Sequence, residues 1–303
     1  MSVVDPDLIG PGAGGAPPTL VAPASEARTA RNERLRLLLR TPTVLVGAFV
    51  LLFWVTFAIL GDRITPYDPI FDQSQDVLVG PSSEHWFGTD TLGRDVFSRV
   101  LAGSRDILLV APAATLLGTV LGTAIGLVIG YFRRRVDDVV SRVIDAILVL
   151  PVILTGVVVI TALGSRSPLI VTILIGIVFA PLVARTVRAA VLAESELDYV
   201  QAARLRGERA PYVMFKEILP NVMPPIVVEF TVRLGYAIFA VAGLTFIGLG
   251  IQPPSPDWAV QVFEYYSFVD PYWWATVFPA LAIASLVIAV NLVADGVREV
   301  YER

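Results

Sequence analysis

Charged side chains inside apolar segments are the residues of this chain most able to do chemistry. Glu229 and Arg233 lie four positions apart in a long apolar run, so on a helix they share a face and can pair. Arg142 and Asp145 lie near one end of another apolar run. Charges within a membrane are costly and often functional. We expect Glu229 and Arg233 either to line a substrate path or, the interpretation we favour, to form a structural pair at a subunit interface. Arg142 and Asp145 are interpreted as structural or close to a gate.

Patterns for catalysis and metal binding are weak. His85, Asp90 and Asp95 lack the defined geometry of a metal site, so we expect no metal here and a loop held by hydrogen bonds. The chain has no cysteine and no nucleophile–base pair at a credible spacing. Its one lysine, Lys216, follows Phe215 and not the glycine of a phosphate-binding loop. We therefore expect neither an enzyme nor an ATP site, and no cofactor in this chain.

The composition indicates a membrane protein. Hydrophobic residues make up 55% of the chain, charged residues only 17%, and the mean hydropathy is +0.71. A soluble protein usually carries about a quarter charged residues. The net charge of −4, with basic residues in several separate clusters, gives no support for nucleic-acid binding. Membrane lipid is the expected surrounding.

Six apolar runs are long enough to cross a bilayer, for which about 20 residues are needed. Pro151 is expected to kink the third run, and the second has glycines at helix-packing spacings. The predicted fold class is an all-α polytopic membrane protein with six transmembrane helices. The runs are Thr43–Leu60, Ile107–Tyr131, Val139–Leu163, Leu169–Val187, Val222–Leu249 and Trp273–Ala294.

The basic residues predict the orientation. Sixteen lie before the first run, after the sixth, between runs two and three, or between runs four and five or at the ends of those two runs, against five on the opposite side. Because basic residues accumulate in cytoplasmic segments, both termini are expected in the cytoplasm and the segment 61–104 outside. The first 27 residues hold five prolines, four glycines and no basic residue, which predicts a disordered tail before the arginine-rich stretch that ends at residue 40.

The stretch between runs four and five carries the start and stop signals of two short helices. Asp198 and Gln201 fit a capping box, and Gly207 suits the left-handed residue that ends a helix. Pro211 suits the first turn of a second helix, which ends near Leu219-Pro220. These signals predict a helix–turn–helix elbow on the cytoplasmic surface. Periodicity alone leaves a solvated connecting loop equally open.

The same stretch, QAARLRGERAPYVMFKEILPN, resembles the coupling loop of ABC-importer permeases. That pattern reads Glu-Ala-Ala, three residues, Gly, nine residues and Ile-x-Leu-Pro. Two positions depart from it, because Gln201 replaces the glutamate and Glu217 the isoleucine. The glutamine loses a charge, which puts an ionic contact from that position in doubt.

Further motifs extend the resemblance over residues 40–300. HWFGTDTLGRDVFSRVLAGSRDILLV, SRVIDAILVLP, GLTFIGLGIQPPSPDW and NLVADGVRE resemble the dipeptide, oligopeptide and nickel importer permeases, specifically their C-type subunit. The implied organisation is a cytoplasmic tail (1–40), a first transmembrane helix (41–60), an external region (61–104), a five-helix core with a coupling loop at about 194–220 (105–295) and a short cytoplasmic tail (296–303).

The resemblance implies a type I importer fold with cytoplasmic coupling helices, in a bacterial or archaeal plasma membrane. It implies four partners: a homologous second permease, two ATPase subunits and an external binding protein. The ATPase subunits bind ATP and Mg²⁺, and the binding protein delivers the substrate. The implied substrates are dipeptides or oligopeptides, with nickel or another small solute as the alternative. An ion-coupled secondary transporter has less support, because the elbow would have no role there.

The resemblance also assigns ATPase coupling to residues of the elbow. Tyr212, Val213 and Phe215 are expected to fill an apolar groove of the ATPase, and Arg206, Arg209 and Lys216 to face acidic side chains at its rim. The expected coupling residues are Gln201, Ala202, Ala203, Arg206, Gly207, Pro211, Tyr212, Phe215, Leu219 and Pro220.

Overall fold

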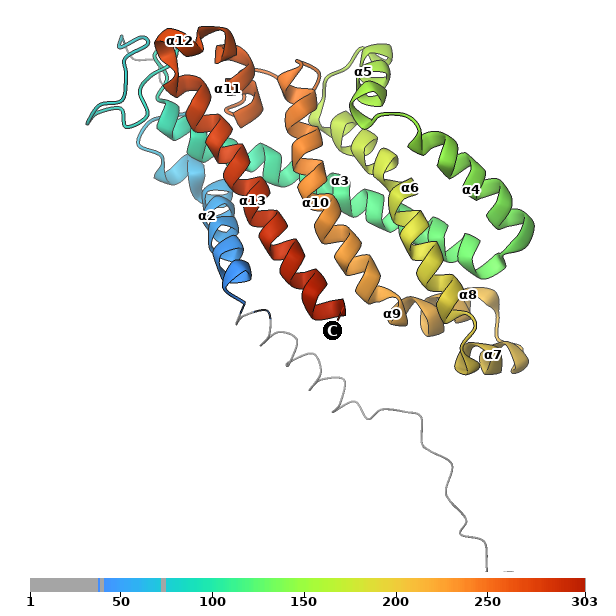
Figure 1. Cartoon of the computed structure of the whole chain (residues 1–303). Helices are drawn as coiled ribbons and strands as arrows, with labels where there is room; N and C mark the ends of the chain where they lie inside the picture. Colours follow the sequence, from blue (N-terminus) through green and yellow to red (C-terminus); the bar gives the residue numbers. More distant parts are fainter. Residues whose placement is uncertain (1–37, 39–40, 72–74, 303) are drawn as a thin grey trace, which may run out of the picture.

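The computed structural model describes residues 38, 41–71 and 75–302, and these residues form a bundle of helices. The predicted tail at 1–40 therefore lies almost wholly outside the described residues. Long helices run between two ends, one formed by α7, α8 and α9 and the other by α11 and α12 (Figure 1). The helices are α2 (Pro42–Ile64), α3 (Val96–Phe132), α4 (Arg134–Leu148), α5 (Val152–Leu163), α6 (Pro168–Glu194), α7 (Asp198–Leu205), α8 (Ala210–Tyr212), α9 (Leu219–Asn221), α10 (Met223–Phe246), α11 (Trp258–Tyr265), α12 (Val269–Tyr272) and α13 (Trp274–Glu302).

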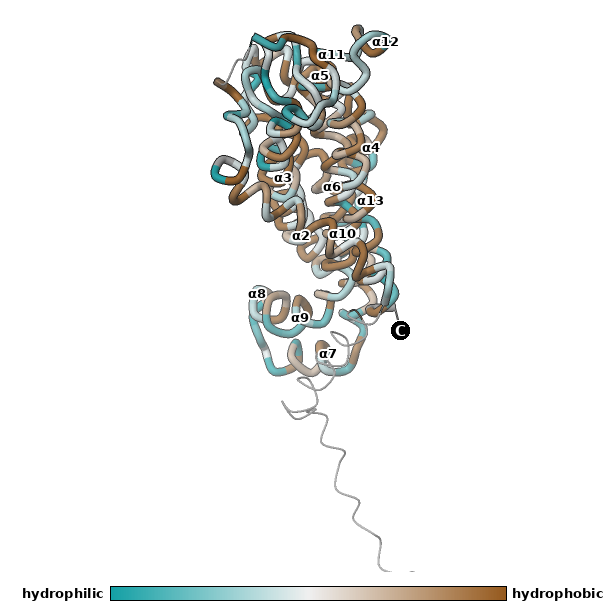
Figure 2. Tube along the Cα trace, turned by 90° about the vertical axis from the view of Figure 1, so that its left-hand side faces the viewer, coloured by the Kyte–Doolittle hydropathy of each residue, from teal (hydrophilic) through white to brown (hydrophobic). Residues whose placement is uncertain are grey.

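The apolar composition of the long helices confirms the all-α membrane class. α2, α3, α6, α10 and α13 are each long and apolar enough to cross a membrane, and α4 with α5 makes a sixth span if that bent pair is counted as one. Hydrophobic residues dominate the middle of the bundle, whereas hydrophilic residues gather towards its two ends (Figure 2). Helix α13 continues to Glu302, so the expected tail at 296–303 is largely helical.

The packing of α3 against α6 follows from the glycine spacing. A Cβ added to Gly126 would lie 2.7 Å from Cβ of Val187, and one added to Gly130 would lie 2.8 Å from Cβ of Val191. Gly118 and Gly122 meet the backbone of α6 in the same way. Since four residues make about one turn, these glycines form a stripe on which α6 rests. The close approach holds together the two helices that carry the elbow.

The third predicted span is broken and not merely kinked. α4 and α5 are bent by 87° at the segment around Pro151. Proline lacks the N–H that would continue the helix, and it disfavours a helical residue before it. Asp137 of α4 accepts hydrogen bonds from Nε and NH2 of Arg188 on α6, the second at 2.7 Å. This pair fixes the first turn of α4 to α6, at the end of α4 away from the break.

Polar side chains hold the loop before α3, at the end opposite the elbow. Nδ1 of His85 lies 2.9 Å from Oδ1 of Asp95, and Nε of Arg94 donates to Asp90 at 2.6 Å. Asp95 also caps α3 by accepting from the N–H of Ser98. The expectation of a hydrogen-bonded loop is confirmed, although α3 begins at residue 96 and takes up part of the predicted external segment.

Candidate functional site

The elbow, residues 198–220, connects α6 to α10 and turns sharply at Gly207. Gly207 has a φ of +78°, as expected for a left-handed residue at a helix end. Its N–H donates to the carbonyl of Arg204, and the next N–H, of Glu208, donates to that of Ala203. Pro211 lies in the first turn of α8, which continues through a π-helical segment (Val213–Ile218) into α9. The predicted pair of short helices is therefore confirmed.

The predicted capping box at the start of α7 is wrong. The helix begins at Asp198, its N-cap position is Leu197, and no side chain caps it. Because Asp198 is already helical, its carboxylate is one residue too late to accept from the unpaired amides. Gln201 instead donates from Nε2 to the carbonyl of Ser195, at 3.1 Å, and ties α7 back to the end of α6.

Three contacts fix the elbow to the bundle. The hydroxyl of Tyr199 donates to Oε1 of Glu194 at 2.5 Å and accepts from Nδ2 of Asn221 at 2.8 Å, which joins α6, α7 and α9. Burial, followed by the hydrogen bond to Glu194, raises the pKa of Tyr199 well above its usual range. The guanidinium of Arg204 lies 4.7 Å from the ring centre of Tyr131, at the end of α3.

The third contact is an ion pair between Arg133, directly after α3, and Glu196, two residues before the elbow. With the other two, it makes the elbow an extension of α3 and α6 and not a free loop. Sequence reasoning missed all three contacts, because they carry no motif and, apart from Tyr199 with Glu194, their partners are far apart in the chain.

One face of the elbow is buried in its own small core. Val200, Ala203, Val213 and Ile218 are fully buried and pack in one cluster with α6 residues such as Val191. Val213 was expected to fill a groove of a partner, and this expectation is wrong. Ala203, an expected coupling residue, is also buried, so its role is to hold the elbow together.

The other face of the elbow is apolar and exposed. Leu205 is 88% exposed, Phe215 55% and Tyr212 46%, and a Cβ placed on Gly207 would have no atom within 4 Å. Sequence reasoning missed Leu205, although its position opposite the buried side of α7 was a usable signal. Among the other expected coupling residues, Leu219 is half-buried. The rest are exposed: Gln201, Ala202, Arg206, Pro211 and Pro220.

The charged side chains of the elbow are only loosely paired. NH2 of Arg206 lies 3.8 Å from Oε1 of Glu217, and Arg209 and Lys216 are exposed. Exposed pairs contribute little to stability, so these charges are available to a partner.

Glu229 and Arg233 form the predicted ion pair within α10. Nε and NH2 of Arg233 both lie 2.6 Å from Oε1 of Glu229, and the two side chains are 19% (Arg233) and 12% (Glu229) exposed. The guanidinium also lies 5.5 Å from the ring centre of Tyr236. The structure therefore confirms the pairing, whereas the role of the pair is open.

Arg142 and Asp145 lie apart from that pair, on exposed positions of α4. Asp145 lines a cavity of about 250 Å³ together with Arg185 and Arg188 of α6. Within the described residues, no hydrogen bond or ion pair connects these side chains to Glu229 or Arg233. A role near a gate stays a prediction.

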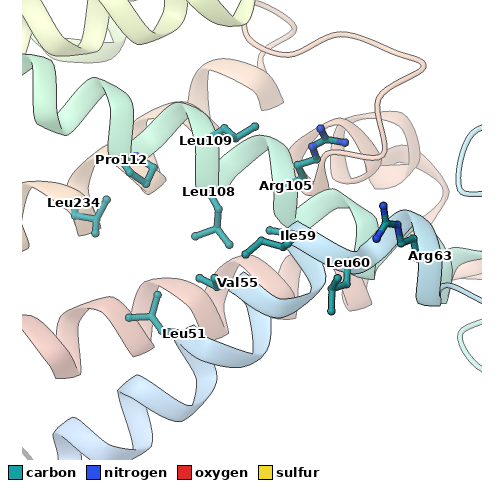
Figure 3. A pocket seen from close by; sticks show the side chains of 11 residues that line it. Leu51, Val55, Ile59, Leu60, Arg63, Arg105, Leu108, Leu109, Pro112 and Leu234 are labelled. Atoms are coloured by element: carbon teal, nitrogen blue, oxygen red, sulfur yellow. The ribbon is translucent and has the colours of Figure 1, made fainter.

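A cavity of about 770 Å³ lies between α2 and α3, also lined by Leu234 of α10 (Figure 3). Its walls are aliphatic apart from Arg63 and Arg105, which lie together towards one end. Neither member of the ion pair lines it.

Comparison with known proteins identifies the family. Residues 122–303 match the family described as binding-protein-dependent transport system inner membrane component. The chain belongs to this family. As such an inner membrane component it serves transport and spans the membrane several times, and the predicted ABC-importer permease relationship is confirmed.

Three curated relatives cover most of this inner membrane component. A dipeptide transport system permease protein of Alkalihalophilus pseudofirmus is 33% identical over 88% of both chains. A glutathione transport system permease protein of Pectobacterium atrosepticum is 37% identical over 90% of both. A di/tripeptide transport system permease protein of Pseudomonas aeruginosa is 36% identical over 84% of this chain and 85% of its own.

A solved structure confirms the fold. A chain of the MetNI methionine ABC transporter, in an inward-facing form, matches with a TM-score of 0.56 at 20% identity. The match covers 67% of this chain and 96% of that chain. At this sequence identity the match is evidence for the fold alone. That fold is the fold of an ABC-importer permease.

Proposed function

We propose that this chain is one permease subunit of an ATP-driven importer that takes up small peptides. The observation that carries the proposal is the elbow: an apolar, exposed face on two short helices that are fixed to the ends of α3 and α6. Leu205, Tyr212 and Phe215 offer this face to a partner, and an exposed apolar patch rimmed by charges is typical of a protein interface.

The partner at the elbow is an ATPase subunit. Two such subunits bind ATP and Mg²⁺, which this chain does not, and their closure moves the elbow of this permease and that of a homologous second permease. An external binding protein delivers the substrate. The distribution of arginines supports an orientation in which the elbow and both termini are cytoplasmic. The subunit itself catalyses no reaction.

The names of the relatives support small peptides as the substrate. They are described as permeases for dipeptides, di/tripeptides and glutathione, and each matches over most of the chain. Nickel or another small solute is the alternative cargo for the same architecture. An ion-driven carrier is the second alternative, and the rigid elbow argues against it.

Reconstitution of the whole complex in liposomes tests the proposal. Uptake of tritiated alanyl-phenylalanine should require ATP, both ATPase subunits and the external binding protein, and this chain alone should show only background ATP hydrolysis. Uptake driven by an ion gradient without ATPase subunits would contradict the mechanism. Uptake of ⁶³Ni²⁺ in place of the dipeptide would contradict the substrate.

A further inference from the structure

Two cavities follow one another along the groove between α6 and α10. The first, of about 340 Å³, is lined by Leu182 of α6 and Arg233 of α10. The second, of about 420 Å³, is lined by Thr186 of α6 and Glu229 of α10, and also by Arg298 of α13. Since Leu182 and Thr186, like Arg233 and Glu229, are one helical turn apart, the cavities lie in sequence and the ion pair lies where they meet.

Among the described residues, the Glu229–Arg233 ion pair leaves some of its hydrogen-bonding groups free. Both Nε and NH2 of Arg233 are directed to a single oxygen, Oε1 of Glu229. Within the part of the chain that the structure describes, this leaves Oε2 of Glu229 and NH1 of Arg233 without a partner. A pair placed only for stability would be expected to satisfy more of these groups, because guanidinium and carboxylate match as a two-bond fork.

The wall opposite the pair is the break between α4 and α5. Pro151, Val152 and Ile153 line the first cavity, together with the aromatic side chains of Phe179 and Tyr236. Irregular backbone at membrane depth is tolerated only where it is buried in protein or lines a water-filled cavity. The bend of 87° therefore has a structural reason if this groove holds water and solute.

We propose that the α6–α10 groove is this chain's contact site for the transported peptide, where Arg233 receives the peptide carboxylate and Glu229 receives its ammonium group. This inference rests on the proposed function. A peptide with both termini free carries one charge of each sign, so the ion pair can open and exchange partners without leaving a charge unpaired. Removing one partner of a buried pair is costly, and a zwitterion avoids that cost.

The dimensions agree with a small peptide. Ligand pockets typically measure about 300–1,000 Å³, and each of the two cavities, of about 340 and 420 Å³, lies within that range. The ring of Tyr236 next to Arg233 offers an apolar surface for a side chain beside the charged backbone termini. A groove that instead receives a helix of the second permease is the competing possibility, and it makes the opposite prediction for access of water.

The absence of cysteine from the chain makes this groove directly testable. In the purified complex, Tyr236→Cys should react with a water-soluble thiosulfonate reagent, read as a mass shift of this subunit. Alanyl-phenylalanine at about ten times its Kd should slow the reaction roughly tenfold, because few sites stay open. N-acetyl-alanyl-phenylalanine amide has the same side chains but no charges, and it should give no protection.

Two further variants serve as controls. Val152→Cys, on the opposite wall, repeats the measurement if Tyr236→Cys does not assemble. Phe49→Cys lies on an exposed face of α2 that lines none of these cavities, and it should not react in a bilayer. Adding Glu229→Gln and Arg233→Gln to Tyr236→Cys should leave the thiol reactive but remove the protection by the dipeptide.

Each outcome decides the matter. Thiols at 236 and 152 that stay unreactive in an assembled complex would mean that protein covers the groove. Equal protection by the blocked peptide would mean that the ion pair does not read the termini. Either result overturns this inference while wild-type uptake of the dipeptide still supports the proposed function, and failure of wild-type uptake removes that function itself.

Discussion

Single residues decide whether the charges on α10 are tolerated. Glu229→Leu or Arg233→Leu should each lower the thermal stability of the purified chain, because an unpaired charge in this position costs about 3–5 kcal/mol. Changing both residues to leucine should cost less than either single change. The measurement is a double-mutant cycle of unfolding temperatures in detergent. A double variant as unstable as the sum of the singles would show that the two side chains act separately.

Gly207 tests the elbow. Gly207→Asp should abolish uptake at normal membrane levels, since the residue has a positive φ and the added carboxylate would extend into the open space on the exposed face where we propose that the ATPase docks. Backbone strain adds about 1–2 kcal/mol, which the bundle tolerates. Gly164→Asp is the matched control, because Gly164 also has a positive φ and open space around it but lies at the end of α5. If both variants transport normally, the elbow is only a connector.

Asp257 should make stability depend on pH. Burial, opposed by N–H donors of Val260 and Ala259, raises the pKa of Asp257 to about 7. Between its unfolded and folded pKa the native state holds a proton that the unfolded state has lost, so stability falls as the pH rises from 4 to 7 and levels above. Asp257 is the N-cap residue of α11. Asp257→Asn keeps a side-chain oxygen that can accept from the first amides of that helix, but it removes the ionisable group and with it this pH dependence. Unfolding temperatures at pH 5 and 8 should therefore differ less in the variant than in the wild type.

At this scale the sequence predicted what is local. The spacing of Glu229 and Arg233 was enough to predict their pair, and the neighbours of Gly207 were enough to predict its left-handed turn. Val213 was assigned to the wrong side and Leu205 was not singled out, because the buried face of a short helix depends on contacts with α6 that lie far away in the chain. The cap at Asp198 failed by one residue, within the usual uncertainty of helix ends.

Among the elements, the contact of α3 with α6 is the most sensitive to volume. Gly122→Val should destabilise the bundle by about 1–3 kcal/mol or more, because overpacking forces backbones apart. Gly243→Val is the control, since a Cβ there meets only Ile153, at 3.6 Å. Unfolding temperature and elution as a single species should separate the two variants, and equal behaviour would contradict the tight contact.

Hydropathy was sufficient to find the long helices but not their geometry. Each predicted run overlaps an observed helix, because the cost of exposing backbone to lipid makes helices obligatory. Pro151 marked the right place in the third run, yet proline alone gives no angle. The bend lies at Pro151, whereas the Asp137–Arg188 pair fixes the other end of α4, and no pattern of neighbouring residues predicts that contact.

For the whole molecule, orientation is the property to test. Reporter fusions after Arg135 and Glu208 should lie in the cytoplasm, and fusions after Ser83 and Pro256 outside, because the arginines gather at the ends of the helices next to the elbow. An external reporter after Glu208 would place the elbow on the wrong side for an ATPase. The sequence predicted this arrangement as a sum of weak signals, whereas the structure was needed to separate the buried face of the elbow from its exposed face.

The exposed face of the elbow also bears on how the cell must supply this protein. Under the proposed function an ATPase subunit covers Leu205, Tyr212 and Phe215, so a newly inserted copy without that partner leaves an apolar patch exposed. Orphan subunits of this kind are prone to clumping and to removal by proteases. This permease subunit and its ATPase partner must then be synthesised in balanced amounts if they are to accumulate. Overproduction of the permease subunit alone should shorten its lifetime.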